Sequence, residues 1–313
     1  MSKKEFAQWL VYVLVRVFVC LIQTLPLESC QHLARCLAFL ACDILRVREQ
    51  VVTDNLRSVF PDLSADERHV LARRMWEHLF LMICEIAHAP RKIHRTNWTQ
   101  FIDMPNRQGF VSRLLDSRAK IVVSAHFGNF EVAGYACGLL GFPTFTVARR
   151  LDNPYLDRYV NRFRGANGQF IIPKDGSANQ IQTILSAGGA LTLLGDQHAG
   201  TKGCWIDFFG RPASCHKAIA VFSLTTGAPL LVAYAKRTRR PLHFEAGLFA
   251  IADPADDGDE MTGVKPLTQW YNSKLEQLIL TAPDQYWWLH RRWKPPPKRQ
   301  TAHLQQRQLR RSA

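Results

Sequence analysis

The sequence is poor in acidic residues and has no paired cysteines. Its 313 residues include 40 Lys and Arg against 26 Asp and Glu, which gives a formal net charge of +14. None of the eight cysteines forms a C-x-x-C pair or has zinc-like spacing with histidines. The pattern argues against a disulfide framework or a zinc site and favours free thiols in a reducing compartment. There is no internal repeat, no low-complexity linker and no recognisable nucleic-acid-binding motif.

The composition nevertheless provides for a sizeable core and for anionic partners. Hydrophobic residues make up 47% of the chain, enough at this length for one large core or two modest ones. The positive charge favours a phospholipid leaflet, a phosphorylated lipid, nucleic acid or an acidic carrier protein. Helical stretches alternate with short strand-like runs, which predicts an α/β fold with a mixed central sheet flanked by helices.

A long stretch near the N-terminus is almost without charge. Between Glu5 and Glu28 the only charged residue is Arg16, and a central arginine costs roughly 2.5–3.5 kcal/mol on membrane-insertion scales. Arg16 shares one stripe of the predicted helix with Trp9 and Tyr12. Such a one-sided stripe is typical of a helix that lies in a membrane with this side toward protein or headgroups. We therefore predict a membrane-anchor helix over 1–27 rather than a buried core helix or a cleaved signal peptide.

The remainder divides into a helical part and an α/β part. Residues 28–95 have a helical pattern, in which Ser64 and Glu67 form a capping box that predicts a helix near 65–85. We predict a domain over 28–294 that consists of this helical layer (28–95) and an α/β core (96–294), followed by a basic, disordered tail over 295–313. Strands are predicted at 119–125, 143–148, 168–172, 190–195, 229–235 and 243–251.

Residues 121–131, IVVSAHFGNFE, contain the first candidate for catalysis. A β-branched run ends at Ser124, and His126 comes two residues later. Glu131 stands five positions after His126. On one continuous helix that spacing would put the two side chains about 140° apart, whereas a strand-to-helix turn brings them together. Glu131 would then accept from one imidazole nitrogen and leave the other free to take a proton, as in a general base with an orienting acid. Alternatively, Glu131 only complements the helix dipole.

The second cluster spans residues 190–217, where an apolar run is followed by Asp196 and Gln197. Because strands of open α/β sheets end at the ligand crevice, Asp196 and His126 are expected to face one site; a turn-capping role for Asp196 is the alternative. The aromatic loop 205–209 is expected to line a hydrophobic channel or to join the core. One or two of five nearby arginines are expected to bind phosphate: Arg149, Arg150, Arg158, Arg162 and Arg164.

Three motifs, in this order, resemble those of a known family. They are HFGNFE at 126–131, GDQHAG and FFGRPAS between 195 and 214, and PDQYWWLHRRWK at 283–294. The chain is similar to the bacterial lipid A late acyltransferases of the lauroyl/myristoyl type, in the lysophospholipid acyltransferase superfamily, whose mark is His-x4-Asp/Glu. The resemblance covers nearly the whole chain to about residue 294, and it implies a glycerolipid acyltransferase-like fold.

The resemblance also implies an activity and a set of site residues. An acyl chain would move from an acyl-carrier-protein or coenzyme A thioester to a hydroxyl of a lipid A precursor, without a metal or a redox cofactor. His126 would be the general base and Glu131 its orienting acid, while amides at Gly128 and Asn129 would stabilise the oxyanion. Substrate-binding or oxyanion roles are implied for further residues, with Arg164 foremost: Arg149, Arg164, Asp196 and Gln197.

The implied partners are acyl carrier protein, a phosphorylated glycolipid acceptor and an anionic membrane leaflet, and not nucleic acid. Because carrier proteins are cytosolic, the protein would lie at the inner (cytoplasmic) membrane with its active site on the cytoplasmic face. Two alternatives stay open. One is acylation of another membrane lipid, such as a phosphoinositol mannoside, an ornithine lipid or a glycerophospholipid. The other is a basic membrane-binding protein without catalysis.

Overall fold

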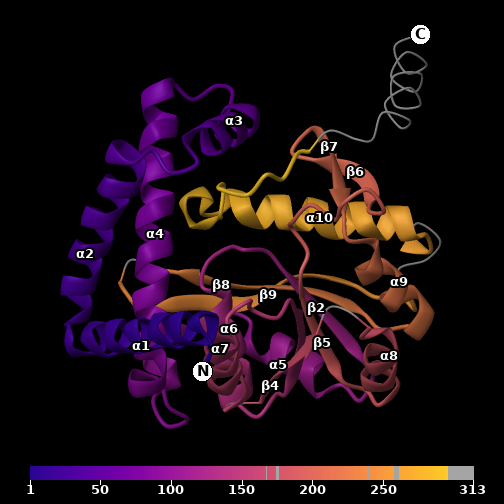
Figure 1. The fold of residues 1–313 in the computed structure, drawn as a ribbon. Coiled ribbons are helices and arrows are strands. Elements are labelled where there is room, and N and C mark those ends of the chain that lie inside the picture. Colours follow the sequence, from indigo (N-terminus) through magenta and orange to yellow (C-terminus); the bar gives the residue numbers. More distant parts are fainter. Residues whose placement is uncertain (167, 174–175, 239, 257–260, 295–313) are drawn as a thin grey trace.

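The computed structural model describes residues 1–294 except 167, 174–175, 239 and 257–260. The tail predicted over 295–313 therefore lies outside the described residues. The chain begins with helices that stand together beside the central sheet (Figure 1). They are α1 (Lys3–Thr24), α2 (Leu27–Phe39), a π-helical segment (Leu40–Ile44), α3 (Glu49–Val59) and α4 (Ala65–Lys92).

Helix α4 begins at the predicted capping box. The Glu67 amide donates to Ser64 Oγ at 3.2 Å, and the Ser64 amide donates to Glu67 Oε2 at 2.7 Å. The helix is longer than the predicted 65–85 and ends at Lys92. Pro90 lies inside its last turn. Its buried face carries polar side chains that contact the strand-to-helix turn described below.

The central sheet is mixed, as predicted. Its order is β1-β9-β8-β2-β5-β3-β4, with parallel pairing except where β9 runs antiparallel to β8. Every predicted run overlaps one of the longer strands, because β-branched and apolar residues dominate strands that are buried on both faces. The strands are β1 (Ile102–Asp103), β2 (Lys120–Ser124), β3 (Thr144–Ala148), β4 (Gln169–Pro173), β5 (Ala190–Leu194), β8 (Leu230–Arg237) and β9 (Phe244–Ala252).

Helices cover both faces of the sheet. In Figure 1, α10 lies along one face, and α5, α6 and α7 lie on the opposite side. These helices and those near the sheet edge are α5 (Arg107–Leu115), α6 (Phe130–Leu139), α7 (Pro154–Gly165), α8 (Ala178–Ser186), α9 (Lys217–Thr226) and α10 (Val264–Leu280).

The segment expected to be an aromatic loop at 205–209 is mostly a strand. β6 (Cys204–Phe208) and β7 (Arg211–Cys215) form an antiparallel hairpin, with Phe209 in the turn at a positive φ of 53°. Phe208 is buried in the main hydrophobic core, and the half-buried Phe209 packs against it. Of the two expectations for these aromatic residues, the structure therefore favours a place in the core.

Helix α1 turns its polar stripe toward the protein. The Arg16 guanidinium lies 4.9 Å from the centre of the Tyr159 ring of α7, and Gln8 Nε2 donates to the Asp152 carbonyl at 3.1 Å. The outer side of the helix exposes large apolar residues, including Leu14 and Leu21 at 59% and 60% exposure. By length and composition α1 is able to cross a membrane, and its exposed apolar face is what a lipid environment would cover.

Candidate active site

His126 and Asp196 meet at the carboxyl ends of two neighbouring strands. Ser124 at the end of β2 pairs with Leu194 at the end of β5, so the residues two positions further on arrive side by side. Asp196 Oδ1 accepts from His126 Nδ1 at 2.9 Å, and Oδ2 accepts from the His126 amide at 3.1 Å. Along the strand order, the chain continues from β2 to β3 in one direction and from β5 to β8 in the other, which makes this the kind of switch point where α/β proteins bind ligands.

The surroundings fix the protonation of this pair. The Asp196 side chain is fully buried. Burial by itself would raise the pKa of Asp196, but the charge of His126 and its hydrogen bonds outweigh burial and lower this pKa to about 2. Asp196 is therefore a carboxylate at neutral pH, and it requires the proton of the imidazole to be on Nδ1.

The second imidazole nitrogen, Nε2, carries the lone pair in that tautomer. Gln197 Nε2 lies 3.2 Å from it and 3.1 Å from His290 Nε2, so the two amide hydrogens of Gln197 reach two accepting imidazoles. Burial lowers the pKa of His290 to about 4, with the charge of His126 as the next cause. His290 is thus neutral at physiological pH. Trp287 and Phe130 complete a ring of aromatic contacts, with centroids 5.1 and 5.2 Å from that of His126.

Glu131 has a different partner from the one expected. Both of its carboxylate oxygens accept from Arg164 of α7, from Nε at 3.0 Å and from Nη2. The expected pairing of Glu131 with His126 is therefore wrong: a guanidinium offers a bidentate, charged partner, and Asp196 already occupies the imidazole Nδ1. Glu131 and Arg164 lie in the same cavity as His126.

The amides expected to form an oxyanion hole are engaged elsewhere. The Gly128 amide donates to the Gln285 carbonyl at 2.9 Å, and the Asn129 amide donates to the Ala235 carbonyl at 2.8 Å. These long-range bonds hold the strand-to-helix turn against β8 and the C-terminal segment. They also leave neither amide free for an oxyanion, so the expectation for Gly128 and Asn129 is corrected.

The turn itself requires glycine. Gly128 has a φ of +59°, and a Cβ at this position would lie 2.0 Å from the Ala235 carbonyl oxygen. Asn129 then caps α6, because its Oδ1 accepts from the Val132 amide at 3.1 Å. His126 therefore reaches its position through a close approach of two backbone segments that no side chain permits.

A buried polar network on α4 supports the same turn. The fully buried Glu85 accepts from Asn129 Nδ2 at 3.0 Å and from Arg237 Nη2 at 2.7 Å. His78 Nδ1 faces Arg237 Nη1 at 2.7 Å, and His78 Nε2 faces the Gly128 carbonyl at 3.1 Å. Because arginine only donates, His78 accepts at Nδ1 and donates at Nε2. Burial, followed by the charge of Arg237, lowers the pKa of His78, which keeps this imidazole neutral.

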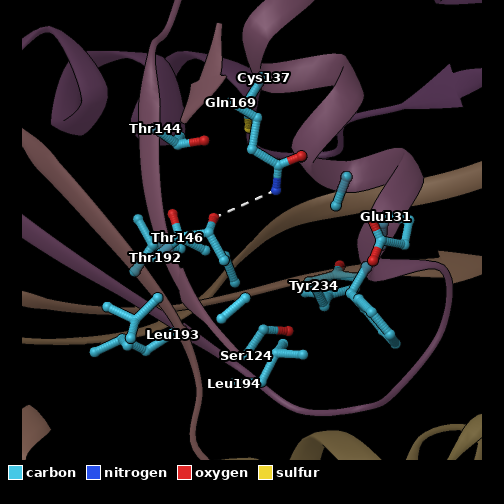
Figure 2. A pocket seen from close by; sticks show the side chains of 18 of the residues that line it. Ser124, Glu131, Cys137, Thr144, Thr146, Gln169, Thr192, Leu193, Leu194 and Tyr234 are labelled. Carbon is cyan, nitrogen blue, oxygen red and sulfur yellow. Dashed lines mark hydrogen bonds between the residues drawn. The ribbon is translucent and has the colours of Figure 1, made fainter. Parts of the chain in front are cut away.

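His126 opens onto an apolar cavity of about 800 Å³ that lies along the sheet and under α5 and α6. Figure 2 shows part of its lining, with Ser124, Leu194, Glu131 and Tyr234 at one end and a group of polar side chains at the other. Gln197 and Arg149 also line it. Arg149 is largely exposed and pairs with Asp152 at 3.0 Å. The cavity lining therefore includes His126, Glu131, Arg149, Arg164 and Gln197, whereas Asp196 lies behind His126.

The sequence profile of the family described as bacterial lipid A biosynthesis acyltransferase matches residues 2–295. The chain belongs to this family. It is 25% identical over 296 residues to the lipid A biosynthesis lauroyltransferase of Escherichia coli, with 93% of each chain covered. It is 26% identical over 263 residues to the palmitoleoyltransferase of the same organism, with 82% of each covered. A lipid A biosynthesis acyltransferase of Haemophilus influenzae is 23% identical over 322 residues, with 97% and 95% covered.

Among solved structures, the chain is similar to the 1-acyl-sn-glycerophosphate acyltransferase PlsC of Thermotoga maritima. The sequence identity is 12% and the TM-score 0.39, with 86% of this chain and all of that one covered.

The acyltransferase also contains site residues that the sequence motifs did not single out. Glu85, Arg237 and His78 have no motif of their own, and they come from α4 and β8. The sequence feature that could have pointed to them is an acid and two histidines within the apolar stretch of α4 (HLFLMICEIAHA). Such residues are buried only where they have polar partners. His290 lies in the PDQYWWLHRRWK motif, and the Gln197 amide contacts both His290 and His126.

Proposed function

We propose that this acyltransferase moves an acyl chain from an acyl-carrier-protein thioester to a hydroxyl of a lipid A precursor, with His126 as general base and Asp196 as its orienting acid. The observation that carries the proposal is the His126–Asp196 pair at the mouth of a large apolar cavity. The reaction needs both a base for the acceptor hydroxyl and a dry space for the donor hydrocarbon.

The proton path follows from the tautomer. His126 Nε2 takes the proton of the acceptor hydroxyl, and the acceptor oxygen forms a bond to the thioester carbonyl carbon. When the tetrahedral intermediate collapses, the carbon–sulfur bond breaks and the leaving thiolate recovers the proton from Nε2. Asp196 stabilises the imidazolium between these steps and remains ionised, since its pKa is about 2. A positioned base contributes roughly 10²–10⁴-fold to the rate.

The acceptor hydroxyl has to displace Gln197 from His126. In the free enzyme, the Gln197 amide lies within hydrogen-bond distance of His126 Nε2. When the substrate displaces Gln197 from His126, the Gln197 side chain keeps its hydrogen bond to His290. We infer that Gln197 marks the position of the reacting hydroxyl and stays close enough to contact the substrate.

Arg164 is the cationic group best placed to meet negative charge in the cavity. Two of its five N–H groups donate to Glu131, and within the described residues the other three have no hydrogen-bond acceptor, which leaves them for an oxyanion or an acceptor phosphate. Glu131 would then position Arg164 rather than the imidazole. Arg149, at the exposed rim, is suited to a phosphate outside the cavity.

The membrane assignment rests on helix α1 and on charge. The apolar outer side of α1 would lie in the bilayer, and the formal charge of +14 would favour an anionic leaflet, a phosphorylated acceptor and an acidic carrier protein. Because the donor is cytosolic, we place the enzyme at the inner membrane with its cavity open to the cytoplasmic side.

The test is acyl transfer from labelled acyl-carrier protein to a purified lipid A precursor in detergent. Wild type is compared with His126→Ala and with His32→Ala, a matched control because His32 is exposed on α2. We expect transfer by wild type and His32→Ala and its loss in a folded His126→Ala. Equal transfer by His126→Ala would refute the base, and transfer only to another lipid would refute the acceptor.

A further inference from the structure

A short segment near the C-terminus lies against the active site. We call residues 286–290 the C-terminal strap. The Trp287 amide donates to the His126 carbonyl at 3.1 Å. The rings of Trp287 and His290 also lie close to the imidazole of His126, with centroids 5.1 and 5.0 Å from its own. The strap therefore contributes two side chains to the surroundings of the base.

No helix or sheet ladder holds this strap in place. Its residues form turns and one isolated bridge, between Tyr286 and Phe127, so its carbonyl groups need partners from elsewhere in the chain. Three successive carbonyls find them at α3. Asn55 Nδ2 donates to the carbonyls of residues 288 and 290 at 2.7 and 2.8 Å. Arg48, at the N-cap of α3, donates from Nη1 to the carbonyl of residue 289 at 3.0 Å.

Asn55 is a polar residue on the buried face of α3. It is 6% exposed, and its neighbours on this face are Val52 and Leu56, at 3% and 0%. Asparagine is unfavourable inside a helix, and polar side chains are buried only where they have partners. Because both partners are carbonyl oxygens, the amide nitrogen must face them. The two N–H groups of one amide thus fix the positions of two strap carbonyls.

The strap is connected to the base through Gln197. The Gln197 amide nitrogen lies 3.1 Å from His290 Nε2 and 3.2 Å from His126 Nε2, and the acceptor hydroxyl has to displace it from His126. Within the described residues, these two imidazoles are the hydrogen-bond partners of the amide. If His290 moved away, Gln197 would keep its hydrogen bond to His126 Nε2 and compete there with the substrate.

From these contacts we propose that Asn55 is a positioning residue for the reaction. It holds the strap so that His290 accepts from Gln197, which leaves His126 Nε2 to the acceptor hydroxyl. The proposal rests on the proposed function, since it takes His126 as the base. It gives α3 a part in catalysis, although none of the residues of this helix lines the cavity.

The test measures acyl transfer by Asn55→Leu, which keeps the size of the side chain and removes both donors. We expect kcat to fall by about 10–100-fold and KM for the acyl-carrier-protein thioester to stay within about twofold, because the base is obstructed while the cavity is intact. Ser58→Ala is the matched control on α3. Ser58 Oγ accepts from Arg211 Nη1 of the β6–β7 hairpin at 2.9 Å, and the variant should retain wild-type kcat. A folded Asn55→Leu enzyme with wild-type kcat would overturn the proposal.

A double-mutant cycle separates positioning from a loss of folded protein. His290→Phe removes the acceptor through which Asn55 acts and should itself lower kcat. In the His290→Phe enzyme, we expect Asn55→Leu to lower kcat further by less than about twofold. Losses that multiply in the double variant would show a general structural effect and would contradict the proposal. If Asn55→Leu does not fold, Asn55→Ala takes its place in the same cycle with the same criteria.

Hydrogen exchange of the strap amides tests the structural step without turnover. We expect residues 286–290 to exchange faster in Asn55→Leu than in wild type or Ser58→Ala, because the strap opens more often. Equal exchange in the three proteins would refute the role of Asn55. If wild type transfers no acyl chain but the exchange rates differ as expected, the proposed function fails while the attachment of the strap by Asn55 is supported.

Discussion

Replacement of Asp196 by asparagine tests the arrangement that distinguishes this active site. Asp196→Asn keeps the size of the side chain but removes the charge that His126 faces. Burial raises the pKa of Asp196, but the charge of His126 and the hydrogen bonds from His126 lower it from 3.8 to about 2. This net shift corresponds to about 2 kcal/mol. Loss of that energy alone predicts a fall in kcat of about one to two orders of magnitude.

A change in the tautomer of the His126 imidazole would lower kcat further. An asparagine amide group facing Nδ1 would favour the imidazole proton on Nε2, where it blocks proton uptake. We therefore expect kcat to fall by about 10²–10⁴-fold, with little change in thermal unfolding. The assay is steady-state acyl transfer at saturating donor, with Asp54→Asn on the exposed face of α3 as the matched control. A folded Asp196→Asn enzyme that retains kcat within a few-fold of wild type would refute the reasoning.

Further predictions concern the turn, its support and pH. Gly128→Ala should abolish activity and lower the melting temperature, because its Cβ would lie 2.0 Å from a carbonyl oxygen of β8. The control is Gly141→Ala, which shares a positive φ but has open space around its Cβ and should lower the melting temperature only slightly. Equal losses of melting temperature in the two variants would refute the clash. Arg237→Met should cost about 3–5 kcal/mol in urea unfolding by leaving Glu85 as an unpaired buried charge, and a loss below 1 kcal/mol would contradict this role. Because the pKa of His290 is lowered to about 4, the unfolded state binds more protons between about pH 6.5 and 4, so stability should fall by about 1–3 kcal/mol as pH drops through this window. His290→Gln should reduce that fall in urea unfolding, and an unchanged pH dependence would contradict the lowered pKa.

Much of the fold follows from local patterns, and the differences have local causes. The runs that became β2 and β5 are apolar and β-branched, so strands were predicted with nearly correct bounds. The hairpin of β6 and β7 was missed because Pro212 and the aromatic run 205–209 look like a loop. The predicted end of α4, near residue 85, is too early, because the helix continues past Pro90 to Lys92.

The site was predictable where strand ends determine it and unpredictable where distant partners do. His126 and Asp196 were expected to face one site because each follows a strand, and the structure confirms that they meet. Glu131 was assigned to His126 by sequence proximity, but Arg164, 33 residues away, binds it instead. The amides at Gly128 and Asn129 appeared available only because their acceptors on β8 and in the C-terminal segment cannot be inferred from a motif.

The central claim is that this chain acylates a lipid A precursor through His126. The most direct measurement is mass spectrometry of lipid A from a host strain that lacks its own secondary acyltransferase and expresses either wild type or His126→Ala. The account predicts that wild type adds the mass of one acyl chain to lipid A and that the variant, present in the membrane at the same level, adds none. Unchanged lipid A in the presence of folded, membrane-bound wild type would contradict it.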